Sequence, residues 1–233
     1  MEYVRRRSST SNSAERSWHN LTRILAIADE VDEGLYGDKL KRLQADIVLG
    51  CGDLPFDYLE YIVSRLNVPL LYVPGNHDPD LRPLDETWSP MRAESPSKGP
   101  QGCVDIDGRL VEEAGLRIAG LGGSMRYKPG PNQYTEAQMR WRAWRIELVA
   151  SVRRGRGGRR IDVLLTHAPP QGFSGKEDDL AHRGFAAFNR LIKNLQPRLL
   201  VHGHIHPYGV SQPVRKVGGT LIINAVPHRW IEV

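Results

Sequence analysis

The sequence has no apolar run that approaches the roughly 20 residues needed to cross a bilayer, so we expect no membrane contact. Its first 20 residues include Arg5-Arg6-Arg7 without an apolar stretch behind them, and we therefore expect no secretory signal there. Because this segment is rich in Ser, Asn and Arg, we predict that residues 1–20 form a disordered tail. The remaining residues, 21–233, are enough to bury a full hydrophobic core, which predicts a single domain.

Cysteine is scarce as well. Only Cys51 and Cys103 occur, and neither lies in a Cys-x-x-Cys pair, which excludes a disulfide framework and fits a reducing cytoplasm. Acidic residues are in deficit, because 27 Asp and Glu stand against 32 Lys and Arg, giving a net charge of +5 and a pI near 9.3. Much of this excess lies in residues 5–7 and 153–160, and it favours an anionic partner without identifying one.

Apolar runs alternate with amphipathic segments in the first third of the sequence. The pattern predicts strands over residues 23–28, 46–49 and 68–73, separated by helices over residues 35–43 and 56–66. This βαβαβ order indicates a parallel or mixed sheet. Further along, we predict a loop over 79–100, a hairpin over 104–111 turning at Asp107-Gly108, strands over 116–121, 161–165 and 198–201, helices over 135–152 and 179–195, and antiparallel strands over 220–224 and 229–233.

Metal-ligating side chains follow five of the predicted strands, each a few residues past the apolar run. These residues are Asp29, Asp53, Asn76 with His77 and Asp78, His167, and His204 with His206. In open α/β sheets, sites form beyond the carboxyl ends of the strands. A lone His after a strand is usually structural, but five coordinated placements of Asp, Asn and His are hard to explain as core packing. We interpret them as ligands for two divalent metal ions, with Asp53 placed to bridge them.

The order Asp, Gly-Asp, Gly-Asn-His-Asp, His, Gly-His-x-His resembles the calcineurin-like metallophosphoesterase superfamily, over residues 24 to about 224. The resemblance implies an α/β fold in which two mixed β-sheets pack face to face as a sandwich flanked by helices. It also implies the metal ligands. They are Asp53, Asn76, His167 and His204 for one ion, and Asp29, Asp53 and His206 for the other. Manganese, iron, zinc and magnesium all suit oxygen and nitrogen ligands of this kind.

The first motif departs from the family pattern. The family usually has Asp-x-His there, whereas this chain has Asp29-Glu30-Val31, and a valine side chain cannot bind a metal. In the purple acid phosphatase branch a Tyr three residues after the second-motif Asp replaces that His, but here Phe56 stands at that position. We expect the site lacking the imidazole to bind its ion weakly, or to be filled only when substrate arrives.

The resemblance implies hydrolysis of a phosphate ester by a metal-activated water. It assigns His77 as the catalytic proton donor to the leaving group. We predict that Asp78 holds the His77 imidazole in place, with Asp57 as a less well-positioned candidate. A small phosphodiester or a nucleotide is the expected substrate, with diesters slightly favoured over monoesters. Arg126 and His182 are candidate substrate-binding residues, although each also has an ordinary surface interpretation.

Two other functions stay open. The arginine-rich residues 153–160 are compatible with a nuclease or RNA-processing phosphodiesterase, in which case nucleic acid is a partner. Their simpler interpretation is a solvated loop after a helix, because no aromatic residues are interleaved. We predict that Trp141 and Trp144 pack in the core rather than stack on bases. The loss of His at Val31 would also suit a catalytically weak scaffold, but such a protein has no use for His77.

Overall fold

The computed structural model describes residues 21–81, 99–152, 161–175, 178–207 and 214–233. The predicted N-terminal tail, the arginine-rich segment 153–160 and most of the predicted loop over 79–100 lie outside these residues. Among the described residues, no helix combines the length and apolar character that crossing a membrane requires.

Five strands form the first sheet, in the order β13-β1-β2-β3-β4. The strands are β1 (Arg23–Ile27), β2 (Ile47–Gly50), β3 (Leu70–Tyr72), β4 (Cys103–Asp105) and β13 (His228–Glu232). β1 to β4 are parallel, and β13 runs antiparallel beside β1. The polar residues that follow β1, β2 and β3 therefore meet at one edge of this sheet.

Six strands form the second sheet, in the order β11-β12-β10-β9-β6-β5. They are β5 (Leu110–Glu113), β6 (Leu116–Leu121), β9 (Val163–Thr166), β10 (Leu199–His202), β11 (Arg215–Val217) and β12 (Thr220–Asn224). The four central strands are parallel, and the edge strands β5 and β11 are antiparallel to their neighbours. A short parallel pair, β7 (Ser124–Met125) with β8 (Gln133–Tyr134), lies apart from both sheets.

The two sheets pack face to face because their strands carry apolar side chains on both faces, one facing the other sheet and one facing the helices. In β1, Ile24 and Ala26 belong to the core between the sheets, with Ile118 and Val201 of the opposing sheet. A strand presents successive side chains to opposite faces, so Leu25 of the same strand lies in the outer cluster instead. Both faces of the sheets are thus buried.

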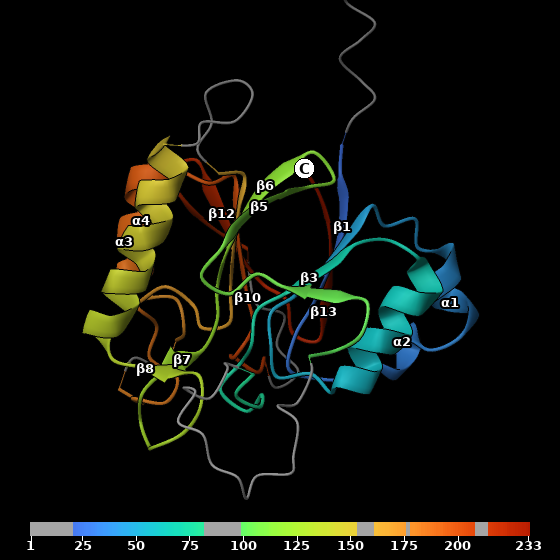
Figure 1. The fold of residues 1–233 in the computed structure, drawn as a ribbon, viewed down its shortest axis with the longest axis horizontal. Coiled ribbons are helices and arrows are strands. Elements are labelled where there is room, and N and C mark those ends of the chain that lie inside the picture. Colours follow the sequence, from blue (N-terminus) through green and yellow to red (C-terminus); the bar gives the residue numbers. More distant parts are fainter. Residues whose placement is uncertain (1–20, 82–98, 153–160, 176–177, 208–213) are drawn as a thin grey trace, which may run out of the picture.

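Helices cover the two outer faces (Figure 1). The five-stranded sheet is covered by the short 3₁₀ helix η2 (Glu33–Leu35), α1 (Asp38–Arg42) and α2 (Phe56–Leu66), and the six-stranded sheet by α3 (Glu136–Val152) and α4 (Ala186–Leu195). This arrangement of two mixed sheets between helix layers confirms the predicted fold class.

The hairpin predicted over residues 104–111 is wrong. β4 pairs with β3 in the first sheet and β5 with β6 in the second, so Asp107-Gly108 lies on the crossing between the sheets. The hairpin that does form joins β5 to β6, and it turns at Ala114 and Gly115, whose φ angles are 48° and 77°. The Asp-Gly dipeptide is a turn signal in both settings, and the Asp107 carboxylate bonds to the Gly122 N–H rather than closing a hairpin.

Helix α4 begins at Ala186, seven residues later than predicted. The Glu136 carboxylate accepts hydrogen bonds from the N–H groups of Ala186 and Ala187, which fixes the start of the helix there. The predicted core packing of the tryptophans is also wrong, because Trp141 and Trp144 are 57% and 49% exposed on the outer side of α3.

Candidate metal centre

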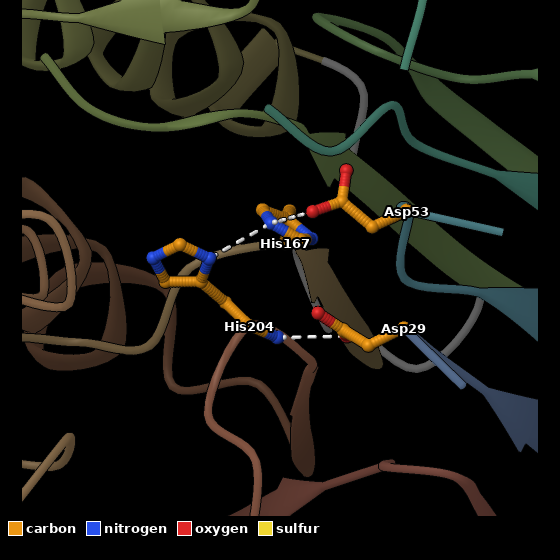
Figure 2. A group of neighbouring side chains, drawn as sticks. All are labelled: Asp29, Asp53, His167 and His204. Atoms are coloured by element: carbon orange, nitrogen blue, oxygen red, sulfur yellow. Dashed lines mark hydrogen bonds and ion pairs between the residues drawn. The ribbon is translucent and has the colours of Figure 1, made fainter. Parts of the chain in front are cut away.

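A polar cluster lies where the carboxyl ends of the two sheets meet. Asp29 and Asp53 follow β1 and β2 of the first sheet, and His167 and His204 follow β9 and β10 of the second. Figure 2 shows their four side chains converging, and their ligand atoms all lie within 4.8 Å of one another. Two carboxylates and two imidazoles at this spacing are a suitable ligand set for a divalent metal ion.

The backbone at the strand ends is forced into conformations that aim these side chains into the cluster. Asp29, Asp53 and His204 all have positive φ angles, of 60°, 56° and 67°. Gly52 has a φ of 92°, and a Cβ there would lie 2.3 Å from the Gly75 nitrogen, so the two glycine turns pack backbone to backbone. Left-handed backbone at several non-glycine residues is costly and is typical of functional sites.

The outer hydrogen bonds of the two imidazoles determine which ring nitrogens face the cluster. His167 Nδ1 lies 2.7 Å from the Cys51 carbonyl oxygen, and His204 Nε2 lies 2.7 Å from the Ala181 carbonyl oxygen. A carbonyl only accepts, so each of these nitrogens carries the proton. In the neutral rings, His167 Nε2 and His204 Nδ1 are therefore bare acceptors, and they lie 3.0 Å apart.

Two more acceptors meet the same point. His167 Nε2 is 3.0 Å from Asn76 Oδ1 and 3.3 Å from Asp53 Oδ2. His167 is fully buried, and Asn76 and His204 are 5% and 7% exposed, so little water reaches these atoms. Four buried acceptors facing one point need a cation or a proton between them. They are the four residues that the family resemblance assigns to one metal ion.

The pKa values in the cluster also indicate that a positive charge is favoured there. Burial alone would lower the pKa of His167, but Asp53 and then Asp29 raise it to about 9. Burial would raise the pKa of Asp53, yet the adjacent His167 lowers it to about 2. Burial, assisted by the charge on His167, lowers the pKa of His204 to about 3. One proton on His167 thus occupies the position that a metal ion would take.

A second ligand group adjoins the first. The Asp29 side chain is 3% exposed, and its Oδ1 lies 3.9 Å from His206 Nε2, while its Oδ2 accepts from the His204 N–H at 2.8 Å. Burial raises the pKa of Asp29 to about 6, against the lowering effect of His167. Val31, which stands where the family has a His, packs against the apolar cluster under α1 and α2.

Glu30 is a functional candidate that the sequence analysis missed. Its Oε1 lies 2.7 Å from His206 Nδ1, so the ring donates to Glu30 and turns Nε2 towards Asp29. Carboxylates that hold the outer nitrogen of a ligating His fix its orientation and raise its basicity. Sequence gives no sign of this contact, because the two residues are 176 positions apart.

His77 is exposed beside the cluster, and its backbone N–H donates to Asp53 Oδ1 at 2.8 Å. Asp78 does not bond to the His77 imidazole among the described residues. Its Oδ2 instead accepts from the N–H groups of Gly75 and Asp53, at 2.7 and 2.9 Å. Asp78 therefore links the backbone of the two glycine turns, at Gly75 and Asp53, while its role towards the His77 imidazole stays a prediction.

Comparison with known proteins agrees with this geometry. The family profile of the calcineurin-like phosphoesterases matches residues 15–208. The chain belongs to this family. One solved crystal structure is similar at 17% identity with a TM-score of 0.59, covering 91% of this chain and 98% of its own. TT1561 of Thermus thermophilus is similar at 15% identity with a TM-score of 0.54, covering 88% of this chain and 89% of its own. No curated protein matches the chain.

Calcineurin-like phosphoesterases typically bind divalent metal ions, and some members of the family are not catalytic, so the cluster is a possible metal site in a family of metal-binding proteins. The two predicted substrate-binding residues differ in their placement. The His182 ring lies 5.4 Å from the His204 ring, and its Nδ1 bonds to Asp179 at 2.5 Å, so it borders the cluster. The Arg126 guanidinium donates hydrogen bonds to the Gln133 carbonyl and to the Gln138 side chain, and not to a residue of the cluster.

Proposed function

We propose that this calcineurin-like phosphoesterase is a metal-dependent hydrolase of a phosphodiester or a nucleotide-type phosphate ester. The observation that carries the proposal is the set of four buried acceptors around His167 Nε2, which only a bound cation satisfies without protonating a ligand. In this proposal Asp53, Asn76, His167 and His204 hold one divalent ion, and Asp29, Asp53 and His206 hold a second. When bound, the ions would polarise the phosphoryl group and lower the pKa of the attacking water towards neutrality.

Three residues have separate tasks in this proposal. Asp53 is nearly buried and ionised, with a pKa of about 2, so it can be shared between two cations at neutral pH. His77 is held at its backbone by Asp53 yet exposed at its ring, which suits a proton donor to a departing alkoxide. Asp78 keeps both turns in register through its two bonds to backbone N–H groups.

The second metal position is the weaker one in this proposal. Val31 supplies no ligand, and His206 and Glu30 are 36% and 47% exposed at their side chains. We propose that Glu30 partly offsets the loss by holding His206, and that manganese is a suitable ion because it accepts mixed oxygen and nitrogen ligands. Both cysteines are unpaired thiols, which suits a reducing compartment such as the cytoplasm.

Hydrolysis of bis-p-nitrophenyl phosphate by metal-stripped protein, with manganese restored, tests the proposal. Asp53→Asn should abolish turnover, because it removes the charge that both ions share. His77→Ala should lower kcat about 10²- to 10⁴-fold on an alkyl diester, whose leaving group needs a proton, and far less on the nitrophenyl ester. The same variant on two leaving groups is its own control, since misfolding would lower both rates equally.

The wild-type result decides between enzyme and scaffold. Turnover that requires metal and depends on Asp53 supports the phosphoesterase. If the protein binds metal but hydrolyses no substrate with manganese, iron or zinc, the result would reject catalysis and favour a scaffold that keeps the fold.

A further inference from the structure

A groove of about 760 Å³ lies on the outer side of the six-stranded sheet, between the β4–β5 crossing and the first half of α3. The residues that shape its chemistry are Asp107, Arg109, Tyr134, Trp141, Arg142 and Arg145. Figure 1 places α3 at the edge of the molecule, on the far side of the sheets from α1 and α2. None of these six residues belongs to the candidate metal centre.

The groove is positively charged because the carboxylates of α3 lie on the side of the helix that faces α4, whereas two of its arginines line the groove. Its carboxylates face α4: Glu136 bonds to the backbone N–H groups that begin α4, and Glu147 bonds to Asn194 and lies 3.4 Å from Arg190. The groove side carries Arg142 and Arg145 instead.

Of the described residues that line the groove, one carries a carboxylate, Asp107, and it forms an ion pair with Arg142. Arg109 and Arg145 are exposed, and within the described part of the chain neither guanidinium forms an ion pair. Two exposed guanidinium groups therefore face the groove, Arg109 in the field of the half-buried Asp105 and Arg145 over the ring of Trp141. An anionic ligand would meet them without breaking an ion pair.

Aromatic rings stand among these cations. Trp141 is 57% exposed, and the Arg145 guanidinium lies 4.9 Å from the centre of its ring. Arg142 lies 4.1 Å from the centre of the Tyr134 ring at the floor of the groove. Trp144, one turn further along the same exposed side of α3, is 49% exposed. The helix thus offers two exposed indoles, and the indole of Trp141 lies beside the exposed Arg145.

We propose that this groove binds single-stranded nucleic acid, with a base stacked on Trp141 and the backbone phosphates paired with Arg109 and Arg145. Stacking platforms interleaved with cations are how proteins hold single strands without reading their sequence. A duplex keeps its bases stacked inside and offers Trp141 nothing to stack on. An apolar protein partner would bury Arg109 and Arg145 unpaired, and a second copy of the chain would bring the same positive charge.

The proposal concerns binding alone and holds whether or not the metal centre hydrolyses nucleic acid. It is tested on metal-free protein in EDTA by the fluorescence anisotropy of a labelled oligothymidylate of about 12 nucleotides, within the usual site size of such proteins. Trp141→Ala should weaken binding about tenfold or more, the loss expected for one stacked base. The double change Arg109→Gln with Arg145→Gln should lower the slope of log affinity against log salt by about 1.4, that is about 0.7 for each lost phosphate contact.

Two matched variants control for charge and for aromatic surface. Arg65→Gln removes an exposed arginine that also lies over an aromatic ring, 5.4 Å from the centre of Tyr61, but on α2. Trp230→Ala removes a 40% exposed indole on β13. Both should bind the oligonucleotide as the wild type does.

An abasic oligonucleotide of the same length separates stacking from charge, and it should bind wild-type protein as weakly as oligothymidylate binds Trp141→Ala. Equal binding of the two oligonucleotides would overturn the proposal, because the groove would then hold only phosphate. Wild-type affinity in Trp141→Ala and in the double variant would overturn it too. So would sedimentation showing that Trp141→Ala dissociates an oligomer while oligonucleotide binding is unchanged.

Discussion

Metal binding and proton binding should compete at His167, and pH is the perturbation that exposes this competition. In the metal-free protein the pKa of His167 is about 9, because Asp53 and Asp29 outweigh the effect of burial. A metal ion needs Nε2 bare, so below pH 9 it has to displace the proton. The bare fraction changes about tenfold per pH unit in that range, which predicts an affinity that rises about tenfold per unit, or ~1.4 kcal/mol, between pH 6.5 and 8.5.

Isothermal titration of manganese into stripped protein measures this directly. In buffers of different ionisation enthalpy, about one proton should be released for the ion bound at the four-acceptor position at pH 7. His204 should add none, because its pKa of about 3 leaves it neutral already. An affinity that is flat from pH 6.5 to 8.5, with no proton released, would refute the assignment of His167 Nε2 as the ligand atom.

Thermal stability should depend on pH in the metal-free protein and not in the metal-bound protein. The folded pKa of His167 lies above its ordinary value of 6.5, so its contribution to the stability of metal-free protein is complete below pH 6.5 and is lost as pH rises through about 9. With a saturating excess of manganese, the gain in affinity of about tenfold per pH unit offsets this loss, so stability should stay nearly constant over the same window. Parallel pH profiles for the two states would contradict the competition.

The other predictions concern the second metal position and the glycine turn after β2. Glu30→Gln should release His206 and so weaken the affinity for the second manganese ion about 10- to 100-fold, while the affinity for the first ion stays unchanged. Electron paramagnetic resonance measures the occupancy of the two positions. An equal loss of affinity at both positions would refute an orienting role for Glu30. Gly52→Ala should cost at least ~3 kcal/mol in urea unfolding, because its φ is 92° and its Cβ would lie 2.3 Å from the Gly75 nitrogen. Gly108 has a φ of 69° and open space around an added Cβ, so Gly108→Ala should lower the free energy of unfolding distinctly less. Equal losses of stability in the two variants would show that the positive φ, and not the close contact with Gly75, determines the cost.

The sequence predicted the fold and the main cluster because both depend on local signals. Each ligand follows an apolar run of strand length, and parallel strands bring their carboxyl ends to one edge whatever their distance in the chain. Long-range contacts left no such signal. The Glu30–His206 bond and the carbonyl oxygens of Cys51 and Ala181, which orient His167 and His204, are visible only in three dimensions.

The errors have physical causes of the same kind. Helix α3 carries large apolar residues on both sides, so periodicity cannot tell its buried side from its exposed one. Met139 and Ile146 are buried against the sheet, whereas Trp141 and Leu148, two positions later in each case, are 57% and 49% exposed. The hairpin predicted at Asp107-Gly108 was wrong because a turn signal in the sequence does not indicate which strands the turn connects.

The division of the ligands between the two sheets has a consequence for how the protein folds. Among the proposed ligands, Asp29, Asp53 and Asn76 follow strands of one sheet, and His167 and His204 follow strands of the other. Neither sheet alone holds a complete ligand set, so an ion binds tightly only after the sandwich has closed. In the proposed function, a bound ion would therefore act as a cross-link between the two sheets. It would make unfolding more nearly all-or-none and destabilise any intermediate in which one sheet has separated.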